Sequence, residues 1–136
     1  MKNPLVSIIM NCYNSDKFLR ESIESIYNQT YANWEIIFWD NASIDDSAKI
    51  AKSYDERIKY YLASETTSLG EARNLALSNV SGEYVAFLDC DDLYLTDKLE
   101  KQVMLMQASG YAMCYGSVVI MNESGQEIKK KIVKNK

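Results

Sequence analysis

Strand-like runs alternate along this chain with segments of helical periodicity, and this alternation constrains the fold more than any other feature. Short strand-like runs, most of them apolar almost throughout, lie at 5–11, 34–40, 57–63 and 83–89. The segments between them space their apolar residues as amphipathic helices do, at 15–29, 44–54 and 70–82. This order predicts an α/β fold with a Rossmann-like, mostly parallel open sheet and helices on both faces.

The last third of the chain continues with one more helix and a predicted β-hairpin. Thr96 or Asp97 can start the helix, and Gly110 ends it. A strand-like run at 111–121 leads into the turn sequence "NESG". We therefore predict one domain over 1–136, made of three parts: a βα core at 4–110, a strand and hairpin at 111–130 and a basic tail at 131–136.

Local signals also predict where one helix begins and which segments face the core. Ser43, with Asp46 three residues on, resembles a capping box for the helix at 44–54. The run at 83–89 reads as a fully buried strand. The helix at 70–82 is expected to turn four side chains toward the core: Leu69, Ala72, Ala76 and Val80.

Composition excludes several classes of function. The net charge of −4 over 136 residues argues against a primarily nucleic-acid-binding protein. The absence of histidine excludes Ser-His-Asp and Cys-His catalysis and His-ligated zinc, so a metal would need oxygen ligands, which favours Mg²⁺ or Mn²⁺. Three widely spaced cysteines indicate small buried thiols in a reducing cytosol. With no signal peptide and no apolar run near the roughly 20 residues of a membrane span, we expect a cytoplasmic protein.

Polar residues collect where three of the predicted strands end. These ends are 11–14, 40–43 and 89–92, and in open α/β sheets ligands bind outside the carboxyl ends of the strands. The third end places Asp89, Asp91 and Asp92 within four residues, with no basic residue before Lys98. Clustered carboxylates raise one another's pKa or bind a cation, and a divalent cation can in turn bind phosphate oxygens. The pattern favours a diphosphate held through a metal.

Other interpretations of these residues remain open. The acids could merely favour the positive end of the following helix, although Thr96 and Asp97 already occupy its start. The glycine-rich sequences GxGxxG and GxxxxGK[ST] are both absent, so neither a dinucleotide site nor a P-loop is supported. Arg73, early in its helix, is equally compatible with phosphate binding and with a solvated surface position.

The ordered motifs YN, QTY..WE, DN.S.D, G.ARN and GEY..FLD.DD resemble family 2 glycosyltransferases with the GT-A fold, from about Pro4 to Gly125. The resemblance implies that Asn11 and Tyr13 border the nucleobase. It implies further that Asp40 lies in the base and ribose pocket with Asn41 beside it, and that Arg73 approaches the nucleotide. The family's DXD motif falls on two residues that would hold both the metal and the nucleotide sugar: Asp89 and Asp91.

This resemblance also implies a reaction, its partners and a location. A sugar would pass from a nucleotide diphosphate sugar, usually UDP-linked, to an acceptor hydroxyl with inversion, with Mn²⁺ or Mg²⁺ on the DXD acids. The acceptor would be a glycan or lipid-linked glycan of polysaccharide biosynthesis, met at the inner face of the membrane by peripheral association. Asn41 departs from the second acid that many members carry, and asparagine adds a hydrogen-bond donor.

The family's acceptor half and catalytic base have no counterpart here, so we expect either a truncated, nucleotide-sugar-binding part with its base beyond the chain end or a short natural relative. Two rival functions remain. The first is a non-catalytic nucleotide-sugar-binding module. The second is a phosphatase of haloacid-dehalogenase type, whose DxD loop "FLDCDD" resembles. Leu93 stands where that family expects Thr or Val, and the motif follows the fourth strand instead of the first.

Overall fold

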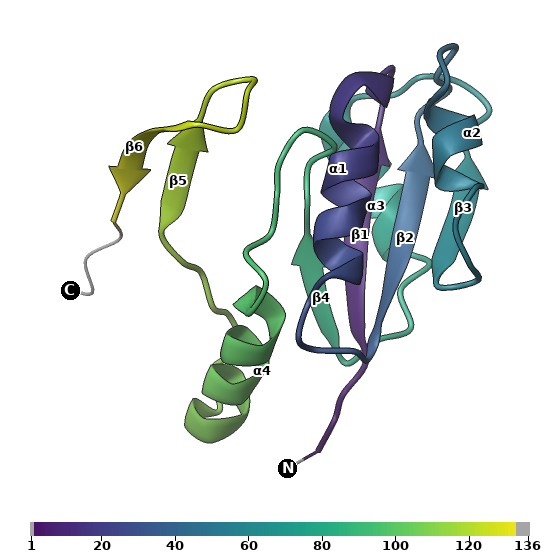
Figure 1. Ribbon diagram of the computed structural model, residues 1–136. Coiled ribbons are helices and arrows are strands. Elements are labelled where there is room, and N and C mark those ends of the chain that lie inside the picture. The colour runs from purple at the N-terminus through teal and green to yellow at the C-terminus, as the bar shows by residue number, and fades with distance from the viewer. Residues whose placement is uncertain (1, 133–136) are drawn as a thin grey trace. The chain divides into compact units, whose positions relative to one another are not determined.

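The computed structural model describes residues 2–132. The chain divides into two compact units, 1–99 and 100–136. The first unit contains all elements up to the start of α4 (Figure 1). Its elements are β1 (Val6–Cys12), α1 (Asp16–Tyr27), β2 (Trp34–Asp40), α2 (Ser47–Ala51), β3 (Ile58–Leu62), α3 (Leu69–Leu77), β4 (Tyr84–Phe87) and the start of α4 (Lys98–Ser109).

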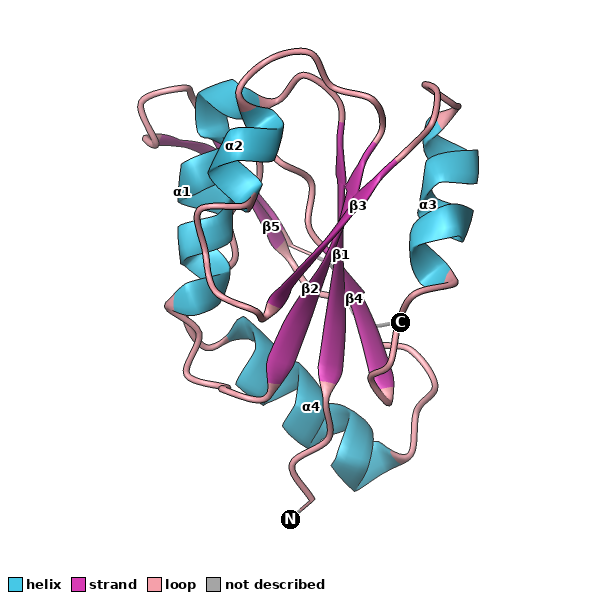
Figure 2. Cartoon of the chain, turned by 90° about the vertical axis from the view of Figure 1, so that its right-hand side faces the viewer, coloured by secondary structure: helices cyan, strands magenta, loops and turns pink. Residues whose placement is uncertain are grey.

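A four-stranded parallel sheet forms the centre of this unit, with strand order β3-β2-β1-β4. Helices α1 and α2 lie on one face of the sheet and α3 lies on the other (Figure 2). The apolar residues of the two central strands are almost completely buried, because both faces are covered. The predicted α/β architecture with a mostly parallel sheet is therefore confirmed.

A buried carboxylate ties the strands together at the amino end of the sheet. Glu35 is 7% exposed, and its Oε1 accepts hydrogen bonds from Ser7 Oγ at 2.6 Å, Ser81 Oγ at 2.7 Å and Ser81 N at 3.1 Å. Ser7 Oγ in turn accepts from Gly82 N at 2.8 Å. A Cβ at Gly82 would lie 2.6 Å from the carbonyl oxygen of Leu5, so only glycine fits this close approach of two backbones.

The helices on either side of β3 are shorter than predicted. The helix expected at 44–54 is only α2, and the capping-box prediction is wrong because Asp46 makes no side-chain cap. Ser43 Oγ instead accepts from Asn14 N at 3.0 Å, which joins the two loops at the carboxyl end of the sheet. Helix α3 starts where Ser68 Oγ accepts from Glu71 N, and it ends five residues before the predicted limit.

Two burial predictions are wrong, and both concern the side of the sheet that α3 covers. Strand β4 is half exposed, with Phe87 at 48%, and Leu69 is 53% exposed. Phe87 pairs in register with Ile9, which lies in the core cluster beneath α3. Because α3 packs over β1 and β2, the outer strand β4 is left uncovered on that face. Ala72 and Ala76 are buried and Val80 is partly buried, as predicted.

The second unit contains the rest of α4 and an antiparallel hairpin of β5 (Val118–Met121) and β6 (Glu127–Lys131). Gly110, with φ of 68°, follows the end of α4, as predicted. The hairpin is confirmed, but its first strand begins at Val118 and not at residue 111. Of the predicted basic tail, Lys131 belongs to β6 and 133–136 lie outside the described residues. Within 2–132, no helix has the length and apolarity needed to cross a membrane.

Candidate functional site

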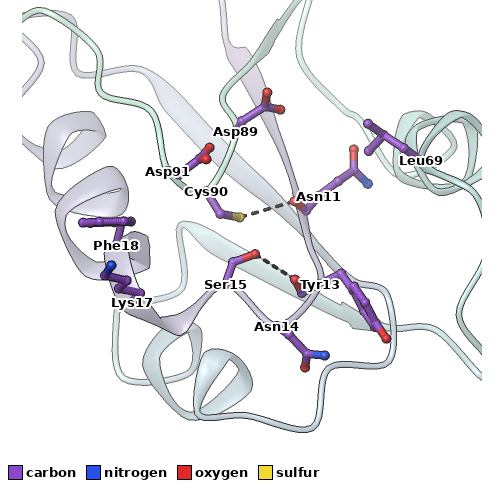
Figure 3. Close-up of a pocket in the computed structure, with 10 residues that line it drawn as sticks. All are labelled: Asn11, Tyr13, Asn14, Ser15, Lys17, Phe18, Leu69, Asp89, Cys90 and Asp91. Carbon is purple, nitrogen blue, oxygen red and sulfur yellow. Dashed lines mark hydrogen bonds between the residues drawn. The ribbon is translucent and has the colours of Figure 1, made fainter. Parts of the chain in front are cut away.

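A cleft of about 420 Å³ opens at the carboxyl end of the parallel sheet. The turn at 89–91 forms one wall, and the loop that leaves β1 forms another (Figure 3). The lining residues are Asn11, Tyr13, Asn14, Ser15, Lys17, Phe18, Leu69, Asp89, Cys90 and Asp91. The cleft therefore contains four of the seven predicted site residues: Asn11, Tyr13, Asp89 and Asp91. They come from two segments that are far apart in sequence.

The acidic wall of the cleft is a tight turn. Asp92 N donates to Asp89 O at 3.1 Å, which closes the turn, and the carboxylates of Asp89 and Asp91 lie beside the cleft (Figure 3). Partial burial, followed by the charges of Asp91 and Asp89, raises the pKa of Asp92. The turn therefore concentrates negative charge at a place open to a ligand.

Arg73 lies beside the acidic turn and contacts its first carboxylate. Arg73 Nη2 is 3.4 Å from Asp89 Oδ1, and the two side chains are 41% and 59% exposed. An ion pair this exposed contributes only about 0–1 kcal/mol to stability, so either partner can turn toward a ligand at little cost. Arg73 therefore contacts a lining residue of the cleft without lining it, and its contact with a nucleotide stays a prediction.

Asn11 and Tyr13 contribute an amide without a hydrogen-bond partner in the described part of the chain and an exposed aromatic ring to the cleft. Asn11 Nδ2 and Oδ1 are both buried, and neither has a hydrogen-bond partner among residues 2–132. Such atoms are costly unless a ligand or water satisfies them. Tyr13 is 54% exposed. Both residues also line a second cleft of about 290 Å³, which shares Leu69 with the first and extends toward Thr66 and Thr67.

Asp40 and Asn41 are already engaged with the protein. Asp40 is completely buried, and its oxygens accept from Ser43 N at 2.8 Å and Tyr60 OH at 2.5 Å. Asn41 Nδ2 donates to Thr67 O at 2.9 Å, and its Oδ1 accepts from Thr67 N at 3.1 Å. Asn41 lines the second cleft, whereas Asp40 lines neither. In this arrangement Asp40 and Asn41 shape the loops of the site, and direct contact with a nucleotide stays a prediction for both.

Two buried thiols lie beneath the acidic turn. Cys90 Sγ donates to Asn11 O at 3.3 Å, and Cys12 Sγ lies 3.9 Å from Ser43 Oγ. The thiol of Cys90 lowers the pKa of Cys12 to about 7, and the thiol of Cys12 together with burial raises the pKa of Cys90. The prediction of small buried thiols is confirmed for Cys12 and Cys90, whereas Cys114 is only partly buried.

The loops around the cleft hold two residues in the left-handed region of backbone conformation. Asn14 has φ of 46° and Ala42 has φ of 64°. Asn14 Oδ1 accepts from Ile44 N at 2.8 Å, and this hydrogen bond offsets part of the cost of the left-handed conformation at Asn14. Ala42 has no side-chain polar group and stores strain of order 1–2 kcal/mol. The loop after β2 is therefore held in a fixed shape by its contacts with the loop after β1.

Sequence reasoning missed several residues of the two clefts. The third strand also ends in a polar run, "SETTS", and the rule applied to the other strands would have found Thr66 and Thr67 there. Lys17 and Phe18 lie on the first turn of α1 and carried no signal, because their distance from the acidic turn depends on how α1 packs. Leu69 was assigned to the core and instead lines both clefts.

The donor set of the acidic turn suits a hard divalent cation. Asp89 and Asp91 offer carboxylate oxygens, and an exposed pair leaves coordination positions open for phosphate oxygens and water. Within 2–132, no group of three or more Cys, Asp or Glu side chains is arranged to hold an ion by itself. A metal at this turn would therefore be shared between the protein and a ligand such as a diphosphate.

Solved structures with the same fold bind nucleotide sugars. One is S. aureus TarS 1-349 in complex with UDP-GlcNAc, with a TM-score of 0.74 and 26% identity over 77% of this chain and 32% of that one. Another is the mannosyltransferase PcManGT from Pyrobaculum calidifontis in complex with GDP-Man and Mn²⁺, with a TM-score of 0.72 and 25% identity over 90% of this chain and 37% of that one. The parallel sheet with its hairpin is accordingly of the GT-A type.

Comparison of the sequence with protein families and curated proteins identifies the family of this chain. The profile of glycosyl transferase family 2 matches residues 7–135, and the chain belongs to that family. It is 39% identical over 125 residues to the UDP-Glc:alpha-D-GlcNAc-diphosphoundecaprenol beta-1,3-glucosyltransferase WfgD of Escherichia coli, covering 91% of this chain and 49% of that protein. It is 36% identical over 130 residues to the putative teichuronic acid biosynthesis glycosyltransferase TuaG of Bacillus subtilis, covering 93% and 52% respectively. The chain thus spans about half the length of these curated relatives.

Proposed function

We propose that this chain binds the donor of an inverting, metal-dependent glycosyltransferase, and that the donor is a nucleotide diphosphate sugar, with UDP as the first nucleotide to test. The observation that carries the proposal is the meeting of Asp89, Asp91, Asn11 and Tyr13 in one cleft at the carboxyl end of the sheet. Family membership supports it, as do the UDP-GlcNAc and GDP-Man complexes of the structural neighbours.

Each side chain of the cleft has a role in this proposal. The exposed ring of Tyr13 packs against the nucleobase, and the unpartnered amide of Asn11 turns to hydrogen-bond the nucleoside. Arg73 exchanges its weak contact with Asp89 for a phosphate oxygen. Asp89 and Asp91 hold Mn²⁺ or Mg²⁺, which when bound supplies Lewis-acid stabilisation of the departing diphosphate.

The reaction is a single displacement at the anomeric carbon. The acceptor oxygen forms its bond to that carbon while the bond to the diphosphate oxygen breaks, and a general base takes the hydroxyl proton. This chain's part is to hold the donor so that the anomeric carbon faces the acceptor. We place the acceptor among lipid-linked glycans of polysaccharide synthesis, met by peripheral association at the cytoplasmic face of the membrane. The names of the relatives WfgD and TuaG support that acceptor class.

The phosphatase alternative gains no support. The family match and the structural neighbours are glycosyltransferases. A phosphatase of that type would use Asp89 as its nucleophile. Trapping a phosphorylated Asp89 during phosphate release would therefore support the phosphatase alternative.

Calorimetric titration of UDP with Mn²⁺ or with EDTA tests the proposal. We expect wild-type binding to be at least tenfold tighter with Mn²⁺, and Asp91→Asn to abolish the difference. Asp92→Asn is the matched control, because it removes the same charge from the same turn but its side chain does not line the cleft. An equal loss of metal-dependent binding in both variants would mean that the net charge of the turn, and not coordination by Asp91, causes the effect. The absence of metal-dependent binding by the wild type would overturn the proposal.

A further inference from the structure

Helix α1 and Gln29, two residues beyond its end, hold the acidic turn and the segment after it through three polar side chains, Ser22, Ser25 and Gln29, which we call the α1 clamp. Their spacing of three and four residues places them on one face of the helical path. Ser22 is completely buried, and its Oγ donates to the carbonyl oxygen of Cys90 at 2.8 Å. Cys90 is the residue between Asp89 and Asp91, so this bond acts at the middle of the proposed cation site.

The other two side chains of the clamp hold the segment that follows the turn. Ser25 Oγ accepts from Tyr94 N at 3.1 Å. Gln29, 8% exposed, donates to Leu95 O at 2.7 Å and accepts from Leu99 N at 3.1 Å. Together with Ser22, these bonds connect α1 to the chain from the acidic turn to the start of α4.

Ser22 differs from an ordinary helical serine. Serine hydroxyls within helices commonly bond to a carbonyl of their own helix, as Ser25 Oγ does to Ser22 O at 2.7 Å. The hydroxyl of Ser22 instead bonds to a carbonyl 68 residues away in sequence. The thiol of Cys90 also joins the turn to β1, by donating to Asn11 O at 3.3 Å, but a thiol is a weak donor.

We propose that Ser22 is a positioning residue for the donor site, with Ser25 and Gln29 as its support, and that it sets the directions of the Asp89 and Asp91 carboxylates. The carbonyl of Cys90 belongs to the peptide unit that joins Cys90 to Asp91, so the bond from Ser22 restrains the backbone between the two acids and with it the spacing of their carboxylates. Without the bond from Ser22, the two carboxylates spend less time in the arrangement that shares a cation with a diphosphate. This inference rests on the proposed function, because it concerns the same cation and the same nucleotide.

The test compares the dissociation constant of UDP in EDTA with that in saturating Mn²⁺, using the full 136-residue chain. We expect Ser22→Ala to reduce the ratio of the two constants by a factor of roughly 2–10, which corresponds to one neutral hydrogen bond. Its UDP affinity in EDTA should stay within about twofold of the wild type, because the cation is then absent.

Ser7→Ala is the matched control. Ser7 is also completely buried and makes two side-chain hydrogen bonds, but at the amino end of the sheet. It should lower the melting temperature and leave the ratio unchanged, which separates positioning from stability. Should Ser22→Ala fail to fold, Ser25→Ala, whose side chain is only partly buried, is expected to reduce the ratio in the same direction.

The outcomes separate this inference from the proposed function. A wild-type chain without Mn²⁺-dependent UDP binding overturns the proposed function and this inference with it. A wild type with such binding and an unchanged ratio in the folded clamp variant overturns this inference alone. A ratio that falls equally in Ser7→Ala also overturns it, because the effect would then follow general stability.

Discussion

Replacing Glu35 by glutamine should destabilise the protein at neutral pH and leave it nearly unaffected in acid. The carboxylate accepts three hydrogen bonds while only 7% exposed. Burial by itself would raise the pKa of Glu35, but the bonds from Ser7 and Ser81 outweigh burial and the net pKa is lowered. The folded state therefore favours the charged form, and Glu35→Gln removes that charge while keeping the shape.

The magnitude follows from the three bonds. Hydrogen bonds to a charged group contribute about 1.5–3 kcal/mol and neutral ones about 0.5–1.5, so the loss is about 1 kcal/mol per bond. The cost of burying the carboxylate offsets part of this sum, which leaves a net loss of about 1–2 kcal/mol. In a domain of this size, such a loss lowers the melting temperature by roughly 3–8 °C.

The pH dependence has a definite sign. A lowered pKa in the folded state stabilises the protein above the unfolded value of about 4.3, and that stabilisation is lost as the pH falls through the folded pKa. Thermal unfolding of the wild type and Glu35→Gln between pH 7 and pH 3 should therefore show a difference that shrinks in acid. Glu83→Gln, at an exposed glutamate directly before β4, should stay within about 0.5 kcal/mol of the wild type at neutral pH. A difference that is constant across this pH range, or a more stable variant at pH 7, would refute the reasoning.

Three further substitutions test the packing around the site and the sheet. Gly82→Ala places a Cβ 2.6 Å from the carbonyl oxygen of Leu5, so we expect urea unfolding to show a free energy of unfolding lower by about 1–3 kcal/mol. An unchanged value would mean that the backbone at Gly82 can move away from Leu5 without cost. Ala42→Gly relieves the left-handed backbone and should raise the melting temperature, with a gain of roughly 0.5–1 kcal/mol after the entropy of glycine is subtracted; a loss would contradict the strain. Tyr60→Phe removes the hydroxyl that donates to the buried Asp40, and guanidinium unfolding should show a loss of about 1.5–3 kcal/mol, whereas an unchanged midpoint would mean that water replaces the hydroxyl.

Sequence reasoning anticipated which residues share the cleft where a general rule links chain order to position in space, whereas their role as a binding site stays a prediction. Parallel strands bring their carboxyl ends to one edge, so Asn11, Tyr13, Asp89 and Asp91 could be assigned to one place from the ends of two strand-like runs. The same rule would have added Thr66 and Thr67 after the third strand.

Predictions of burial failed where a neighbour decided the outcome. The run at 83–89 is as apolar as a central strand, yet Phe87 is 48% exposed because β4 is the outer strand of the sheet and α3 covers β1 and β2. Leu69 failed for a related reason, since it lies at the first turn of α3, beside the cleft and not over the core. Periodicity reports which residues share a face, but it does not report what covers that face.

The sequence by itself determined the order of strands and helices, the acidic turn and the family, because each depends on residues near one another in the chain or on their order. Only the tertiary structure decided how each polar group is used. It buried Asp40 with both oxygens occupied, left the amide of Asn11 without a hydrogen-bond partner among residues 2–132, and placed the hydroxyl of Ser22 on the carbonyl between Asp89 and Asp91. Each of these outcomes depends on a contact between distant segments, and such contacts are set by the packing of α1 and the loops on the sheet.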